Sequence, residues 1–276
     1  MFQTTKPRSR LGSAIYISEL IYHNSVRAVR KTHGNAFMAL FMNMLQTVIF
    51  VLAFYFMFQI LGMRSTAIRG DFMIYIMTGV FLYMTHTKTL GAVVSSEGPA
   101  SPMMQHAPMN TAIAIASAML STLYIQILSL VVILFVYDVA FNPFVMQEIH
   151  DPIGCLAMIL LAWFSGAAIG MLLLAAKPWF PTPVQIVSTV YQRANMIASG
   201  KMFVANSLPP HMLAMFSWNP LFHTIDQSRG HAFVDYNPRN SDWEYALYLS
   251  LILIMIGLMG EFYTRKHASA SWSARR

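Results

Sequence analysis

Charged residues are scarce in this sequence, and cysteine is almost absent. Only 11% of the 276 residues are charged, whereas 56% are hydrophobic. Soluble domains average about 25% charged residues, so this composition excludes a protein that water surrounds on every side. The single cysteine, Cys155, excludes an intrachain disulfide and a metal site built from cysteines.

Motifs for nucleotide and metal chemistry are missing as well. The only Gly-Lys pair, Gly200-Lys201, is followed by Met202, so the phosphate-binding motif G-x-x-x-x-G-K-[ST] does not occur. The nine histidines form no H-E-x-x-H motif. The sequence therefore predicts no catalytic residue, metal site or cofactor in this chain. One alternative is a membrane-embedded enzyme that uses His223 and Asp226, which are three residues apart and share a helical face, as a general-base pair.

The net charge of +7 has an explanation other than nucleic acid. Lysine and arginine gather near the chain ends, as membrane proteins place them on the cytoplasmic side. This distribution predicts that both termini are cytoplasmic and that nucleic acid is not a partner. The basic N-terminus lacks the continuous apolar core of a signal peptide, so we expect it to remain attached.

Long apolar runs dominate the rest of the chain, and a membrane-spanning helix needs about 20 mostly apolar residues. The sequence predicts an all-α integral membrane protein with six transmembrane helices, at 36–61, 72–94, 111–137, 153–176, 184–204 and 245–263. The fifth is unusually polar because it contains Arg193 and Lys201. Charges at membrane depth usually face a bundle interior or a water-filled path, so we expect this helix to line a passage.

Three further segments have distinct patterns. Residues 11–31 form an amphipathic helix with a basic face, suited to the inner membrane surface or, alternatively, to packing on another subunit. The run from Gly166 to Gly170 is a G-x-x-x-G motif, which predicts close helix packing. The region 206–240 is too polar to cross the bilayer as one span, yet FSWNPLF within it is too apolar for a free loop. Two half-helices dipping into the outer leaflet would satisfy both constraints, and an ordinary periplasmic loop is the alternative.

Three stretches resemble a known family: RAVRKTHGNAFMALFMNMLQ before and in the first span, YIMTGVFLYMTHTKT in the second, and SGKMF…LPP…WNPLFHTID…R from Ser199 to Arg229. They are similar to permease subunits of type-2 ABC exporters, most closely those for capsular polysaccharide or O-antigen. The resemblance implies a homodimer in the bacterial inner membrane that exports a lipid-linked polysaccharide. It also implies two separate ATPase subunits that bind ATP and Mg, and further export proteins in the periplasm and outer membrane. Export of a lipid or small molecule is the alternative within the family.

The resemblance also implies functional regions. A cytoplasmic coupling helix at 97–110 would contact the ATPase through Glu97, Ser101, Met104, Gln105 and His106. Periplasmic re-entrant half-helices at 208–233 would close the outer mouth with Pro209, Trp218, Asn219, Pro220, His223, Asp226 and Arg229.

A sugar-conducting path needs aromatic planes and hydrogen-bonding side chains. At 100° per residue, Gln192, Asn195 and Ser199 share one helical face. We therefore expect the path to be lined by Phe54, Tyr55, Phe58, Tyr191, Gln192, Arg193, Asn195, Ser199 and Lys201. Arg193 suits a pyrophosphate or acidic sugar and equally a carboxylate of the bundle.

Overall fold

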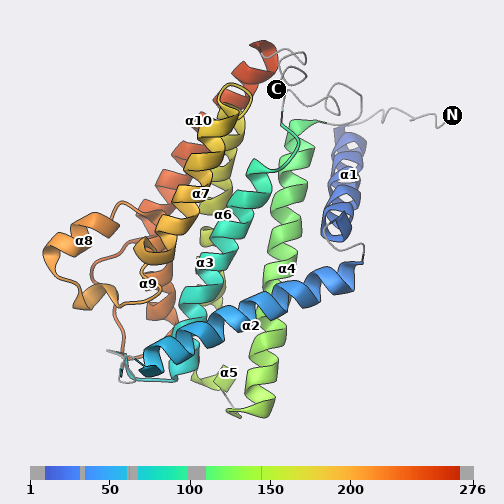
Figure 1. Ribbon diagram of the computed structural model, residues 1–276. Helices are drawn as coiled ribbons and strands as arrows, with labels where there is room; N and C mark the ends of the chain where they lie inside the picture. Colours follow the sequence, from blue (N-terminus) through green and yellow to red (C-terminus); the bar gives the residue numbers. More distant parts are fainter. Residues whose placement is uncertain are drawn as a thin grey trace.

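The protein is a bundle of helices in a computed structural model that describes residues 10–31, 35–60, 62, 68–98, 110–143 and 145–267, with no strand among them (Figure 1). The helices are α1 (Arg10–Lys31), α2 (Ala36–Ile60), α3 (Phe72–Val94), α4 (Thr111–Ala140), α5 (Val145–Glu148), α6 (Pro152–Ala176), α7 (Pro181–Ala198), the 3₁₀ turn η2 (Ala205–Ser207), α8 (Pro210–Phe216), α9 (Pro220–Ala232) and α10 (Trp243–His267). The predicted all-α class is confirmed.

Among the described residues, four helices are long and apolar enough to cross a membrane: Phe37–Ile60, Thr111–Ala140, Pro152–Ala176 and Trp243–His267. They correspond to the first, third, fourth and sixth predicted spans, so the transmembrane character is supported. Helices α3 and α7 also form where spans were predicted, but they are less apolar. The run THTKT at 85–89 lowers the hydropathy of α3, and glutamine, asparagine and Arg193 lower that of α7. The six-span count stays a prediction.

Helix ends follow local sequence signals. Asp71 caps α3 by accepting hydrogen bonds from Met73 N and Ile74 N at 2.7 and 3.0 Å. Asp151 caps α6, where Pro152 occupies the first turn and Gly154 N donates to the carboxylate at 3.0 Å. Both carboxylates satisfy backbone donors that a helix leaves unpaired at its start.

The fifth predicted helix is shorter than expected and shifted. Helix α7 covers Pro181–Ala198 rather than 184–204, with Ser199 as its C-cap. Gly200 follows with φ +77°, a left-handed conformation that favours glycine and ends the helix. The remaining residues form a turn that leads into η2. An 18-residue helix is about 27 Å long, slightly less than the thickness of about 30 Å of a bilayer's hydrocarbon core.

Helices α3 and α6 pack together at the centre of the bundle, and glycines allow their close approach. A Cβ atom at Gly166 would lie 2.4 Å from His86 O, and one at Gly170 would lie 2.9 Å from Val93 Cβ. The predicted tight packing at the G-x-x-x-G motif is therefore confirmed. Helices α4, α9 and α10 surround this central pair, whereas α2 crosses the front of the bundle obliquely (Figure 1).

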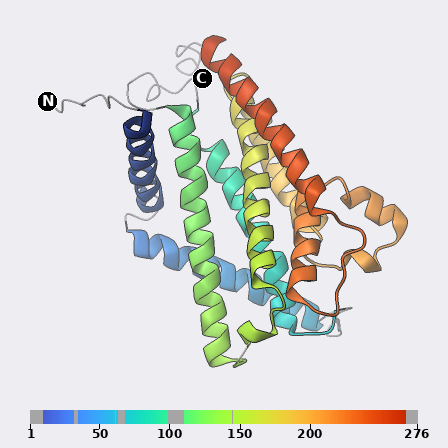
Figure 2. The ribbon, with the colours of Figure 1, turned by 180° about the vertical axis from the view of Figure 1, so that it is seen from behind.

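The predicted amphipathic helix is present as α1, and it packs on α4. The Ser25 hydroxyl donates to Ser117 O, and the Ser117 hydroxyl donates to Ile21 O, both at 3.3 Å. Leu11 and Ile15 remain exposed on α1. Both views show α1 beside the upper part of α4, with the start of α1 and the end of α10 at the same end of the bundle (Figure 2). Its place on the inner leaflet stays a prediction.

The segment 208–233 contains two short helices, α8 and α9, separated by a break at 217–219. The predicted pair of short helices is therefore present. They differ sharply in environment: α8 has no buried residue, whereas α9 is buried along most of its length against α3, α6 and α10. Asn219 caps α9 by accepting from Leu221 N at 3.1 Å. Only α8 has the exposure that a surface lid requires, and α9 belongs to the core.

Candidate functional site

The turn after α7 is fixed by a buried arginine from α9. Arg229 is 1% exposed. Its guanidinium donates to three main-chain carbonyls of the turn, those of Gly200, Lys201 and Phe203, at 2.9, 2.8 and 2.6 Å. The guanidinium also lies over the ring of Tyr75 in α3, with 4.2 Å between Arg229 Cζ and the ring centroid. Arg229 thus joins α3, α9 and the turn in one unit.

The turn directs Lys201 into a group of aromatic rings. Its ammonium nitrogen lies 3.4 Å from the ring centroid of Tyr83 in α3, and 4.9 and 4.8 Å from those of Phe50 and Phe54 in α2. Lys201 is 3% exposed, and its nitrogen has no hydrogen-bond partner among the described residues. The contact is a cation–π cage, and no carboxylate of the described residues pairs with the ammonium.

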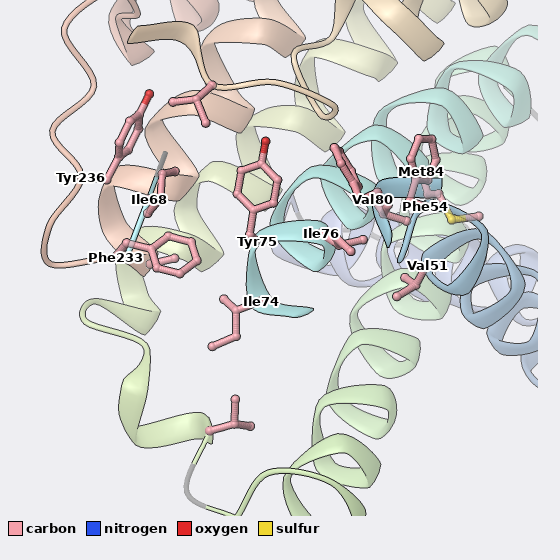
Figure 3. Close-up of a cluster of buried hydrophobic side chains, with 14 residues drawn as sticks. Val51, Phe54, Ile68, Ile74, Tyr75, Ile76, Val80, Met84, Phe233 and Tyr236 are labelled. Atoms are coloured by element: carbon pink, nitrogen blue, oxygen red, sulfur yellow. The ribbon is translucent and has the colours of Figure 1, made fainter. Parts of the chain in front are cut away.

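The cage adjoins the largest hydrophobic cluster of the described chain. This cluster combines residues of α2 and α3 with Phe233 and Tyr236, which follow α9 (Figure 3). Phe54 and Phe58 lie in the cluster and are 6% and 5% exposed. The aromatic residues predicted to line the path from α2 therefore pack largely inside the protomer.

Asp226 of α9 is held by two hydroxyl groups. The Tyr236 hydroxyl donates to Oδ1 at 2.5 Å, and the Ser241 hydroxyl donates to Oδ2 at 2.7 Å. Burial and the neighbouring Asp226 carboxylate raise the pKa of Tyr236, which keeps its hydroxyl a donor. The buried carboxylate thereby ties α9 to the segment that leads into α10.

His223 does not pair with Asp226. Its Nε2 donates to Ser217 O at 2.6 Å, and its Nδ1 accepts from Asp242 N at 2.9 Å. A carbonyl requires a donor and an N–H requires an acceptor, so the ring is neutral with its proton on Nε2. Because both ring nitrogens are occupied by the main chain, the pair considered for enzyme chemistry is not assembled.

The predicted polar face of α7 turns toward the protomer interior. Asn195 is 2% exposed, and its Oδ1 accepts from Asn219 Nδ2 at 2.7 Å. Ser199 is fully buried, whereas Gln192 is half-buried beside Tyr83. Arg193 projects from the opposite, exposed face of α7. Of the α7 residues predicted to line the path, Arg193 is the one whose side chain is exposed in this conformation.

The structure separates the predicted outer-mouth residues into two groups. Pro209 and Trp218 are exposed, and the Trp218 carbonyl accepts from the Tyr245 hydroxyl at 2.9 Å. The buried members are Asn219, Pro220, His223, Asp226 and Arg229. The coupling segment at 97–110 is described only at Glu97, Gly98 and Asn110, none of them helical. Ser101, Met104, Gln105 and His106 lie outside the described residues.

An apolar cavity of about 770 Å³ lies between α2, α3 and α4. Tyr55 lines it, together with Leu52, Val136 and other apolar side chains. Asp71 stands at one end, where its Oδ2 accepts from the Tyr137 hydroxyl at 2.9 Å and from Asn142 Nδ2 at 3.0 Å. The mostly apolar walls suit a hydrocarbon chain. The polar groups at the Asp71 end bind one another and are not needed to bind a ligand.

Sequence reasoning missed two polar clusters on α3, one buried and one half-buried. His86 is fully buried and binds Ser165 Oγ at 2.9 Å and the Tyr191 hydroxyl at 3.1 Å, which joins α3 to α6 and α7. Lys88 donates to Asn43 Oδ1, which joins α3 to α2. The signal was available in the THTKT run, because polar side chains inside an apolar helix require buried partners.

The four long apolar helices among the described residues support an integral membrane protein. Within the described residues, no group of three His, Cys, Asp or Glu side chains could hold a metal ion. The sequence matches no known family model and no curated protein.

Proposed function

We propose that this chain is the membrane-spanning subunit of an ATP-driven exporter that moves a lipid-linked capsular or other cell-surface polysaccharide across the bacterial inner membrane. Two copies form the passage, with six spans each and both termini cytoplasmic. Two separate ABC ATPase subunits bind ATP and Mg and supply the energy. Export proteins in the periplasm and outer membrane receive the polymer.

The buried cations carry this proposal. The ion pairs recorded for the described residues both involve histidine, so Lys201 and Arg229 have no carboxylate partner in a salt bridge. Arg229 is satisfied by three carbonyls, whereas the Lys201 nitrogen has no hydrogen-bond partner among the described residues. Burying such a charge costs several kcal/mol, and a protein that serves only as a membrane anchor gains nothing from it. Intramembrane ionisable groups mark substrate and ion pathways, which favours transport.

The exposed side chains of α7 favour the proposal that a second copy of the chain packs beside this helix. Its exposed side combines Arg193 with Ile186, Val190 and Ile197, which are 58%, 59% and 63% exposed. An arginine among lipid-facing residues is unfavourable. Facing a passage shared by two copies, the same arginine would contact water and the substrate.

Co-purification tests the proposal. The tagged chain is extracted from membranes of its host in a mild detergent, and its partners are identified by mass spectrometry. We expect a nucleotide-binding subunit in equal amount and ATP hydrolysis in the eluate. An unrelated tagged permease provides the control. Recovery of the intact chain without any ATPase subunit would contradict the proposal.

Export of a lipid is the second candidate, and the apolar cavity between α2, α3 and α4 favours it. A fluorescent phospholipid in proteoliposomes with the co-purified ATPase distinguishes the two functions. ATP-dependent movement of the lipid, unaffected by added polysaccharide, would support lipid export. Movement of polymer alone would support the first proposal.

The enzyme alternative is disfavoured by the hydrogen bonds of His223, which leave no ring nitrogen free to act as a base. Replacing His223 with alanine would abolish a defined bond-making activity in such an enzyme. In an exporter, the same substitution removes the hydrogen bond from His223 to Ser217 O, which lies in the break between α8 and α9. We then expect altered transport and no lost bond-making activity.

A further inference from the structure

We propose that Phe50, Phe54 and Tyr83 form a saccharide-binding site that Lys201 occupies in this conformation, and that its ligand is an acidic saccharide. This inference rests on the proposed export function and specifies the substrate class.

The first observation is that the Lys201 ammonium is poorly satisfied. An ammonium group has three N–H donors, and none has an acceptor among the described residues. Aromatic faces attract the charge but accept hydrogen bonds weakly. The cage therefore holds Lys201 in place while leaving it able to bind an anion that supplies oxygen acceptors.

The second observation concerns the rings. Phe50 and Tyr83 are nearly parallel, with centroids 6.0 Å apart and an interplanar angle of 9°. Phe54 adjoins Phe50 with centroids 5.3 Å apart. The electron-rich faces that attract an ammonium also attract the C–H groups on the flat side of a sugar ring. A group of aromatic planes suits a pyranose once the lysine has left.

The third observation is that the parts of this site differ in how firmly they are held. The main chain of Lys201 is fixed by Arg229 and by α3, where a Cβ at Gly79 would lie 2.9 Å from Lys201 Cβ. Helix α2, which supplies two rings, crosses the bundle obliquely, and much of its length is exposed (Figure 1). Movement of α2 would release the ammonium while the turn keeps its shape.

These observations define a ligand with two features. Its sugar face replaces the ammonium on the rings, and its carboxylate pairs with the displaced Lys201 through charge-assisted hydrogen bonds. A neutral saccharide provides only the first contact. We therefore expect the site to prefer uronic-acid polymers to neutral ones.

Binding to the purified full chain in nanodiscs tests this inference. The probes are a hyaluronan octasaccharide, which carries carboxylates, and a neutral dextran oligosaccharide of equal length. We expect the wild type to bind the acidic probe about tenfold more tightly, as one charge-assisted contact provides. Lys201→Met should remove this preference and leave dextran binding unchanged. Phe50→Leu should weaken the binding of both probes about fivefold, because stacking on the ring is lost.

Lys177→Met is the matched control, since the Lys177 ammonium binds Val94 O at 2.8 Å, outside the cage. It should retain the preference for the acidic probe. Thermal melting verifies folding. Lys201→Met should melt close to the wild type, because the loss of the cation–π contacts and the removal of a buried charge have opposite effects on stability.

Three results would overturn the inference, and they distinguish its failure from that of the proposed function. If Lys201→Met still prefers the acidic probe, or if the wild type binds both probes equally, the assignment of the cage fails and polysaccharide export stands. If neither probe binds the wild type, the polysaccharide proposal fails together with it.

Discussion

Replacing Arg229 with methionine tests the unit that fixes the turn after α7. Methionine fills similar space without a charge, and it removes the donors found at 2.6 to 2.9 Å from the carbonyls of Gly200, Lys201 and Phe203. The Gly200 carbonyl still accepts from Phe203 N at 3.3 Å, so the other two carbonyls carry most of the loss. Each buried carbonyl left unsatisfied costs about 1–3 kcal/mol. Removing the buried charge returns part of this penalty, so we expect a net destabilisation of about 3–5 kcal/mol, as for other broken buried charge contacts.

The measurement is thermal unfolding of the purified chain in detergent, followed by intrinsic fluorescence. For a chain of this size, 1 kcal/mol shifts the melting temperature by about 2–4 °C, so Arg229→Met should melt about 10 °C below the wild type. Arg239→Met is the control, because Arg239 is exposed, and it should melt like the wild type. Equal melting of Arg229→Met and Arg239→Met would refute the structural role of the buried guanidinium.

Two further changes address other parts of the structure. Gly166→Ala places a Cβ 2.4 Å from His86 O, whereas the Cβ of Gly91→Ala meets only a side-chain oxygen at 3.9 Å. We expect Gly166→Ala to destabilise the bundle by about 1–3 kcal/mol and Gly91→Ala to be tolerated. Similar melting temperatures of the two variants would contradict the close packing of α3 on α6. The Gly154 N–H, helped by His231, lowers the pKa of Asp151, so its contribution to stability is present above the ordinary pKa of about 3.9 and is lost as the pH falls below it. Asp151→Asn keeps a capping oxygen without the charge, and its melting temperature should fall less between about pH 5 and pH 3; equal slopes would contradict this.

Much of the helical framework could be predicted from the sequence. Apolar runs of sufficient length identified the long helices. Pro181, Pro210 and Pro220 stand at the first position of α7, α8 and α9, where proline fits, yet the start of α7 was predicted three residues too late. The end of α7 could not be predicted in the same way. The apolar residues around Lys201 continue the helical pattern, and only the conformation of Gly200 shows that the chain has already turned.

The candidate site was harder to predict, because its residues come from distant parts of the chain. Spacing on α7 grouped Asn195 with Ser199 correctly on one face, but periodicity does not say whether that face meets water or another helix. The hydrogen bond from Asn219 decides this, and it joins residues 24 positions apart. Similarly, the rings around Lys201 lie on α2 and α3, so no local motif could reveal the cage.

Transport by membrane vesicles tests the central claim most directly. Inside-out vesicles from host cells that make the chain are supplied with the lipid-linked polymer and with or without Mg-ATP, and the polymer protected from an added glycosidase is measured. We predict protection that requires ATP and disappears in vesicles from cells lacking this chain. Equal protection in vesicles with and without the chain would contradict its assignment as the exporter's membrane subunit.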